Sequence, residues 1–272
     1  MAAYIANNAI MNLPTRMSSQ RPGPGPGIVI NAVALRLQAH AVFDGLSLTL
    51  SGGEYHCVLG RSGVGKTSLL NLIAGSVVPD SGEVTNDQGG SLGGQVAYMF
   101  QDDGLLPWLT VLNNVQMGVR LRGERSRATE ERALHLLSSV GLDDWAGALP
   151  GTLSGGMRQR VALARTLVEQ CPVILMDEPF SKLDAITREE LQVLACDLLK
   201  DKTVVMVTHD PSEALRIAHT IVVMHSGSSA GLSEFRLPSE PFRARDHKDV
   251  LSLQSELWSV LSSNCLDSKV PV

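Results

Sequence analysis

The sequence predicts an α/β protein whose core is a mostly parallel β-sheet. Three short apolar runs lack polar alternation, as expected of strands covered on both faces, and they lie at 172–176, 203–208 and 220–224. Helical stretches separate these runs. Asp184 can cap a helix that reaches about Leu199, and Asp210 followed by Pro211 fits an N-cap and a first-turn proline. Such alternation of strands and helices is typical of an α/β core.

The first part of the chain combines a flexible leader with further strands. Residues 1–27 are rich in Pro, Gly, Ser and Asn and end in RPGPGPG, so we expect folding to begin near Ile28. A helix is predicted at 67–75, where Gly75 can end it. Three more apolar runs predict strands, and we expect the N-terminal ones to pair antiparallel: 33–37, 46–50 and 55–60.

A helical subdomain is expected to interrupt the α/β pattern between about residues 110 and 170. Glycines and a proline punctuate it into three helical segments, near 111–121, 127–140 and 154–169. We therefore expect one domain at 28–226 that contains this insertion. Residues 227–272 are expected to form a tail, in which LSLQSELWSVL (251–261) predicts an amphipathic helix.

The composition narrows the class of protein. With 44% hydrophobic residues and a net charge of -5, the 272-residue chain can bury a large core but offers no broad basic surface, so nucleic acid is not expected as a partner. The four cysteines are scattered without a C-x-x-C pair, which predicts reduced thiols rather than a zinc site or disulfides. No apolar stretch approaches the length of a membrane span, and we expect neither secretion nor a transmembrane helix.

The segment after the strand at 55–60 matches the phosphate-binding pattern G-x-x-x-x-G-K-[ST]. Its backbone N–H groups can wrap around phosphates, because glycines allow a close approach and the next helix points its positive end at them. We expect Lys66 to reach the β and γ phosphates and the Thr67 hydroxyl to ligate Mg²⁺. The predicted nucleotide-binding residues here are Gly60, Arg61, Ser62, Gly63, Val64, Gly65, Lys66, Thr67 and Ser68.

A second phosphate partner is predicted in VILMDEP (173–179). Four apolar residues form a buried strand whose end presents Asp177 to the Mg²⁺ shell, while Glu178 is placed to polarise the attacking water. An ordinary helix cap or a solvated acidic pair is the alternative. The P-loop earlier in the chain favours the catalytic interpretation.

Two single polar residues complete the predicted catalytic group. His209 follows the run at 203–208, at the carboxyl end of a strand where α/β proteins bind ligands, and could contact the γ phosphate. Gln101 follows the strand VAYMF (96–100) and could sense Mg²⁺ and the water. The alternatives are a satisfied polar histidine and an exposed loop glutamine.

A second anion site is predicted in LSGGMRQRVALART (153–166). Ser154 can cap the helix, and Gly155 and Gly156 expose N–H groups at its positive end. A plain capped helix is the alternative. If both sites are real, the simplest arrangement is a two-fold dimer in which Ser154 of one copy closes over the nucleotide of the other.

These motifs, in this order, resemble the ABC ATPase family from about Leu35 to Ser226. The resemblance implies ATP hydrolysis with Mg²⁺ at the cytoplasmic face of the inner membrane, where the subunit is peripheral and drives an integral membrane permease. It also implies a D-loop at Ser181–Asp184 and a permease contact at Asp102–Trp108. Soluble ABC ATPases that act on nucleic acid are the alternative class, but they generally carry two cassettes or a long coiled coil.

The residues within these motifs are similar to those of one importer branch. FQDDGLLPWLTVLNNV and MDEPFSKLDAITR resemble importers of taurine, sulfonates, nitrate and thiamine precursors, and GRSGVGKTSLLNLIAG with THDPSEALR favours hydroxymethylpyrimidine among these. In such importers an extracytoplasmic binding protein and the permease select the cargo. The chain departs from the family near Leu37, the position expected to contact adenine, where an aromatic residue is usual. It departs also at Met157 and Lys182, neither of which removes a phosphate ligand.

Overall fold

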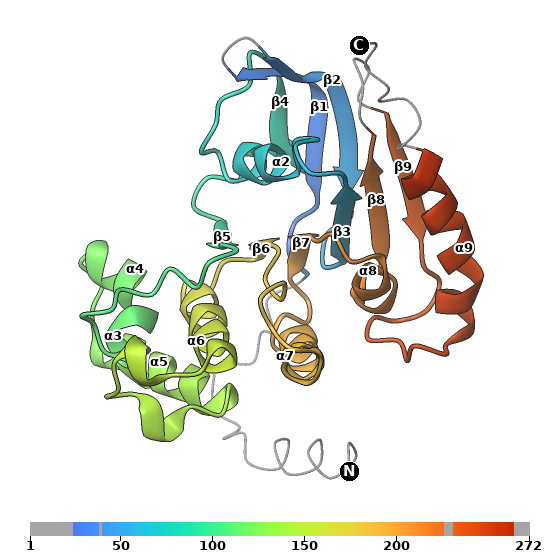
Figure 1. The fold of residues 1–272 in the computed structure, drawn as a ribbon. Coiled ribbons are helices and arrows are strands. Elements are labelled where there is room, and N and C mark those ends of the chain that lie inside the picture. Colours follow the sequence, from blue (N-terminus) through green and yellow to red (C-terminus); the bar gives the residue numbers. More distant parts are fainter. Residues whose placement is uncertain (1–23, 38–39, 226–230, 264–272) are drawn as a thin grey trace, which may run out of the picture.

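The computed structural model describes residues 24–37, 40–225 and 231–263, which form two β-sheets with helices around them (Figure 1). The expected leader therefore lies outside the described residues, except for its last four. The smaller sheet has three strands in the order β2-β1-β4, and the larger has six in the order β5-β6-β7-β3-β8-β9.

The smaller sheet is antiparallel, which confirms the expectation for the N-terminal strands. Its strands are β1 (Ile28–Leu37), β2 (His40–Leu50) and β4 (Ser81–Asn86). The inward side chains of β1 and β2 are buried at alternate positions, as the pleat of a strand requires. The polar sequence of β4 gave no strand signal; this segment forms a strand because it pairs with the free edge of β1.

The larger sheet is mostly parallel, as predicted, and its first five strands run in one direction. These are β5 (Val96–Met99), β6 (Val173–Asp177), β7 (Thr203–Val207), β3 (Tyr55–Gly60) and β8 (Thr220–Met224). The last, β9 (Leu232–Arg236), pairs antiparallel with β8. The sheet thus continues beyond position 226, where a tail was expected, because β9 is a half-exposed edge strand without the apolar run of its neighbours.

Helices cover both faces of the larger sheet. Leu69 and Leu70 of α2 (Lys66–Ile73) pack with Val58 of β3 on one face. Cys57 and Leu59 of the same strand point to the other face. The helices that cover this face include α6 (Gly155–Val168), α7 (Ala185–Leu198) and α8 (Pro211–Ile217).

The helices between β5 and β6 form a separate small core beside the sheet (Figure 1). The segment expected at 111–121 is two helices, α3 (Val111–Val115) and α4 (Met117–Leu121), which meet at Gln116. They pack with α5 (Arg127–Ser139) and one side of α6. Two short 3₁₀ turns, Asp143–Trp145 and Pro150–Thr152, lead into α6.

The segment that follows β9 packs against the rest of the domain. Helix α9 (Lys248–Ser263) includes the predicted 251–261 and contacts α8. The buried Arg243 donates hydrogen bonds from Nη1 to the carbonyls of Ala218, at 2.7 Å, and Leu215, at 3.3 Å. Its backbone N–H bonds the Arg216 carbonyl at 2.9 Å, so the C-terminal segment holds the end of α8 in place.

Candidate active site

The P-loop connects β3 to α2 with a backbone that only glycine allows at two points. Gly65 has a φ of 105°, and a Cβ there would lie 2.8 Å from Cγ1 of Val42. A Cβ on Gly60 would lie 2.9 Å from the Met224 carbonyl oxygen. The strands β2 and β8 therefore hold the loop tightly from both sides.

The Lys66 side chain folds back into this loop. Its Nζ donates hydrogen bonds to the carbonyls of Gly60, at 2.8 Å, and Arg61, at 2.9 Å. Burial lowers the pKa of Lys66, and the nearby carboxylates of Glu178 and Asp177 act in the opposite direction. The ammonium group is thus surrounded by the loop and lies in the field of two acids.

Thr67 and Asp177 come together from different elements. The Thr67 hydroxyl, in the first turn of α2, donates to Oδ2 of Asp177 at the end of β6, with an oxygen–oxygen distance of 2.9 Å. Burial, with the Asp177 charge as a second cause, raises the pKa of the neighbouring Tyr98 well above its usual value. One hydroxyl and one carboxylate oxygen fit Mg²⁺, which takes few protein ligands and prefers oxygen.

Glu178 is the point where three loops meet. Its Oε2 accepts a hydrogen bond from Nε2 of Gln101 at 3.1 Å and lies 3.2 Å from Nδ1 of His209. Its backbone has a φ of 46°, and its N–H bonds the Val207 carbonyl at 2.9 Å. A non-glycine residue in the left-handed region next to a predicted site is a conformation that neighbouring strands must hold.

The Ser154 segment lies apart from this group. Ser154 caps α6, its Oγ accepting the Met157 N–H at 3.3 Å. A Cβ on Gly156 would lie 2.5 Å from Cγ2 of Thr187, so α7 packs directly against this turn. Since α2 and α6 cover opposite faces of the sheet, the two predicted anion sites of one chain are on different sides (Figure 1).

The loop after Gln101 is anchored by residues that the sequence did not reveal. Nε of Arg158 bonds Oδ2 of Asp103 at 2.9 Å, and Nη1 of Arg165 bonds the Gly104 carbonyl at 2.8 Å. Lys182 pairs with Asp102. The two arginines are seven positions apart on α6, a spacing that places them on one helix face and could have been noticed.

The predicted adenine contact lies at the tip of the smaller sheet. Leu37 is the last residue of β1, is paired with His40, and is 44% exposed. Phe43 is 1% exposed and belongs to the core between the smaller sheet and α2, with its ring next to the P-loop glycine Gly65. That aromatic side chain is therefore part of the core and is not available to stack on a base.

The sequence is similar to those of known proteins. The ABC transporter family model matches residues 43–181. The chain belongs to the ABC transporter family. It is 46% identical to the taurine import ATP-binding protein TauB of Pseudomonas aeruginosa over 70% of this chain and 73% of that protein. It is 40% identical to the aliphatic sulfonates import ATP-binding protein SsuB 1 of Rhodococcus jostii, over 89% and 97%.

A solved structure extends the likeness to the fold of this ABC ATPase. The dimeric structure of the ATP-binding cassette MJ0796, bound to ADP and Pi, superposes with a TM-score of 0.66 at 30% identity, covering 78% of this chain and 99% of that chain. The fold predicted from the sequence is therefore confirmed as the fold of the family. The chain is an ATPase of this family. Within the described residues, every helix is too short or too polar to cross a membrane.

Proposed function

We propose that the chain is the ATP-binding and ATP-hydrolysing subunit of an ABC importer for taurine or a related sulfonate. The meeting of Gln101, Glu178 and His209 beside the P-loop supports the chemistry. For the cargo, the support is similarity to proteins named for taurine and aliphatic sulfonate import. These relatives favour the sulfonate alternative over hydroxymethylpyrimidine, the cargo first expected from the motif wording.

Each residue of the group has a role in this proposal. The loop amides from Gly60 to Gly65, with Lys66 and Ser68, hold the phosphates, and Leu37 lies against the adenine. Thr67, Asp177 and Gln101 would hold Mg²⁺, which would neutralise phosphate charge. Glu178 accepts the proton of the attacking water, and His209 contacts the γ phosphate. The water oxygen bonds the γ phosphorus as the bond from this phosphorus to the ADP oxygen breaks, which gives ADP and inorganic phosphate.

The site is completed by a second copy of the chain. Ser154, Gly155 and Gly156 form a capped helix start that a single chain keeps on the other side of its sheet. In a two-fold dimer this helix start faces the γ phosphate held by the partner. The dimeric state of the similar cassette MJ0796 supports this arrangement.

The membrane permease is expected to contact the region after Gln101. Trp108 is 71% exposed and Phe100 is 58% exposed. A cleft of about 540 Å³ lies nearby, between β5, α4 and α6, and Arg165 both lines it and anchors the loop. We place a cytoplasmic permease segment there, so that the chain is peripheral at the cytoplasmic face of the inner membrane. An extracytoplasmic binding protein would deliver the cargo to the permease.

The dimer and the base are tested with two variants. Glu178→Gln is expected to keep ATP binding, lower ATP turnover by about 10²- to 10⁴-fold and accumulate an ATP-bound dimer in light scattering. Ser154→Arg is expected to abolish turnover while each monomer still binds nucleotide. Normal hydrolysis by Glu178→Gln would remove Glu178 from its role, and normal hydrolysis by Ser154→Arg would refute the shared site.

The cargo is tested by deletion of the gene in its host. Growth with taurine or an alkanesulfonate as sole sulfur source should stop, while growth on sulfate continues. Growth of a thiamine-precursor-dependent strain on limiting hydroxymethylpyrimidine should be unaffected. Loss of only the second kind of growth would overturn the sulfonate proposal and restore the pyrimidine one.

A further inference from the structure

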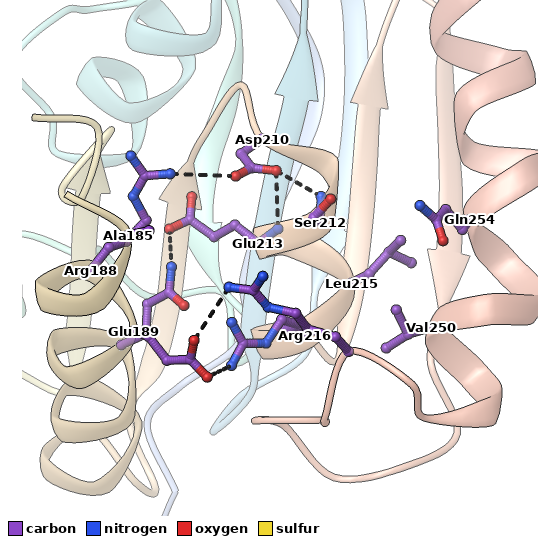
Figure 2. A pocket seen from close by; sticks show the side chains of 12 residues that line it. Ala185, Arg188, Glu189, Asp210, Ser212, Glu213, Leu215, Arg216, Val250 and Gln254 are labelled. Carbon is purple, nitrogen blue, oxygen red and sulfur yellow. Dashed lines mark hydrogen bonds and ion pairs between the residues drawn. The ribbon is translucent and has the colours of Figure 1, made fainter. Parts of the chain in front are cut away.

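A buried carboxyl group lies between α7 and α8, one turn beyond His209. Glu213 is 7% exposed and points from α8 toward α7 (Figure 2). It accepts one hydrogen bond from the Thr208 hydroxyl and one from Nε2 of Gln192, at 2.7 Å. A carboxyl group is costly to bury without such partners, so its position is closely defined by the two bonds.

The Thr208 hydroxyl connects this carboxyl group to the backbone around His209. While its proton goes to Glu213, its oxygen accepts the N–H of Asp210 at 3.1 Å. The Thr208 N–H bonds the carbonyl of Val58, in the strand that leads to the P-loop, at 3.2 Å. The residues before and after His209 are therefore both fixed, and the imidazole between them is aimed at Glu178.

Gln192 connects the Glu213 carboxyl group to helix α7. It is 2% exposed and lies on α7, the helix that Asp184 caps through its Oδ1. Asp184 ends the loop Ser181–Asp184, which follows Glu178 closely in the chain. One carboxyl group thus ties together the helix that follows this loop and the turn that carries His209.

Another glutamate of the same region is bonded differently. A cavity of about 420 Å³ separates α7, α8 and α9, and both Glu189 and Glu213 line it (Figure 2). Glu189 is half-exposed and pairs with the guanidinium groups of Arg216, at 3.0 Å, and Arg245, at 3.3 Å. Glu213 instead accepts hydrogen bonds from neutral groups that belong to the catalytic loops and their helices.

We propose that Glu213 is a positioning residue for His209: through Thr208 it fixes the imidazole beside Glu178, and through Gln192 it makes that position depend on α7. The inference rests on the proposed role of His209 in hydrolysis. Loss of the connection should lower the rate of the chemical step and leave ATP affinity nearly unchanged.

The test removes the Thr208 hydroxyl without changing the volume of the side chain. Thr208→Val is expected to lower kcat for ATP about 10- to 100-fold with KM within about twofold, since small displacements of a catalytic group have effects of this size. Thr208→Ser keeps the hydroxyl and should recover most of this loss. Glu213→Gln retains one good acceptor where two are needed, and should give an intermediate kcat.

Thr203→Val is a matched control for loss of stability. Thr203, at the other end of β7, is fully buried, donates its hydroxyl to the Pro26 carbonyl at 2.8 Å and accepts the Gly53 N–H at 2.9 Å. Each variant loses one hydrogen bond that the hydroxyl donates and one that it accepts from a backbone N–H, at Thr203 in β7 or at Thr208 directly after this strand. We expect both to lower the melting temperature, and only Thr208→Val to lower kcat at a temperature where both are folded.

A double-mutant cycle with His209→Ala decides the mechanism, with slow rates measured in single-turnover reactions. Thr208→Val should add little to the loss caused by His209→Ala, because both act through one imidazole. An equal further loss in the His209→Ala background would refute the positioning role alone. If His209→Ala itself leaves kcat unchanged, the proposed function of His209 fails instead. An equal loss of kcat in Thr203→Val would show that the lower kcat of Thr208→Val results from lost stability.

Discussion

The molecule has two polar clusters that use their hydrogen-bonding groups in opposite ways. The nucleotide-edge cluster, made of Lys66, Thr67, Asp177, Glu178 and His209, reaches the surface, where the His209 side chain is 63% exposed. The interhelix cluster, made of Glu189, Gln192, Glu213, Arg216 and Arg243, lies between helices. Its guanidinium groups bond mainly carbonyls and carboxylates of their own chain.

This difference predicts that the nucleotide-edge cluster serves ligand binding and that the interhelix cluster serves stability. Groups of the nucleotide-edge cluster keep capacity for phosphates and water, so their loss should affect activity far more than folding. Groups of the interhelix cluster have their partners within the chain, so their loss leaves buried donors or acceptors unpaired. The following variants test this separation.

The largest effect is expected from Lys66→Ala. Loss of a charged donor to two phosphates should weaken ATP binding at least about 100-fold, as measured by calorimetry. The free energy of unfolding in urea should change little, because the carbonyls that Lys66 bonds belong to the exposed Arg61 and the half-buried Gly60, where water can replace the lost donor. A large loss of stability without ATP would contradict the assignment of Lys66 to the ligand-binding cluster.

Next in size is Arg243→Met. It leaves the carbonyls at the end of α8 without their donor, and we expect the free energy of unfolding to fall by about 2 kcal/mol in urea denaturation. Arg245→Met, at a 73% exposed side chain, is the matched control and should cost much less. ATP affinity should be retained in both variants. Its loss in Arg243→Met would show that the interhelix cluster also affects nucleotide binding.

A smaller effect concerns pH. Burial raises the pKa of Glu213 above that of the unfolded chain, although its hydrogen bonds and Arg188 act in the opposite direction and Asp210 adds to the rise. The folded state therefore binds the proton more tightly, and stability falls as pH increases from the unfolded to the folded pKa. Relative to the wild type, Glu213→Gln should lack this decline in urea denaturation at increasing pH. Parallel curves would mean that Glu213 titrates as in the unfolded chain.

The smallest effect is expected from Lys182→Ala. Its ion pair with Asp102 joins two mostly exposed side chains, and such pairs contribute under about 1 kcal/mol. Urea denaturation should show a change within that limit. A larger change would show that this pair stabilises the loop after Gln101 more than an exposed ion pair should.

The sequence allowed most of the nucleotide-edge cluster to be predicted, because each part is a local pattern. The glycine pattern at Gly60–Thr67 predicts a loop and a helix start, and the apolar run before Asp177 predicts a strand that ends there. The meeting of Gln101, Glu178 and His209 follows from parallel strands whose carboxyl ends share one edge. The tip at Leu37 was less informative, since the nearby Phe43 proved to be part of the core.

The interhelix cluster could not be predicted, because its partners are distant in the chain. Arg243 bonds carbonyls about 25 residues away, and nothing near it in sequence marks α8 as its target. Glu213 and Gln192 are both polar residues on helix faces that would usually be assigned to solvent. The strands β4 and β9 were missed for a related reason: pairing at an edge, rather than an apolar pattern, makes them strands.

The placement of α2 and α6 on opposite faces of the sheet has a genetic consequence. In the proposed dimer, each ATP contacts the P-loop of one subunit and the Ser154 helix of the other. A subunit with Lys66→Ala paired with a subunit carrying Ser154→Arg concentrates both lesions in one site and leaves the other site wild type. Two alleles that are each inactive alone should then restore hydrolysis when they are expressed in the same cell.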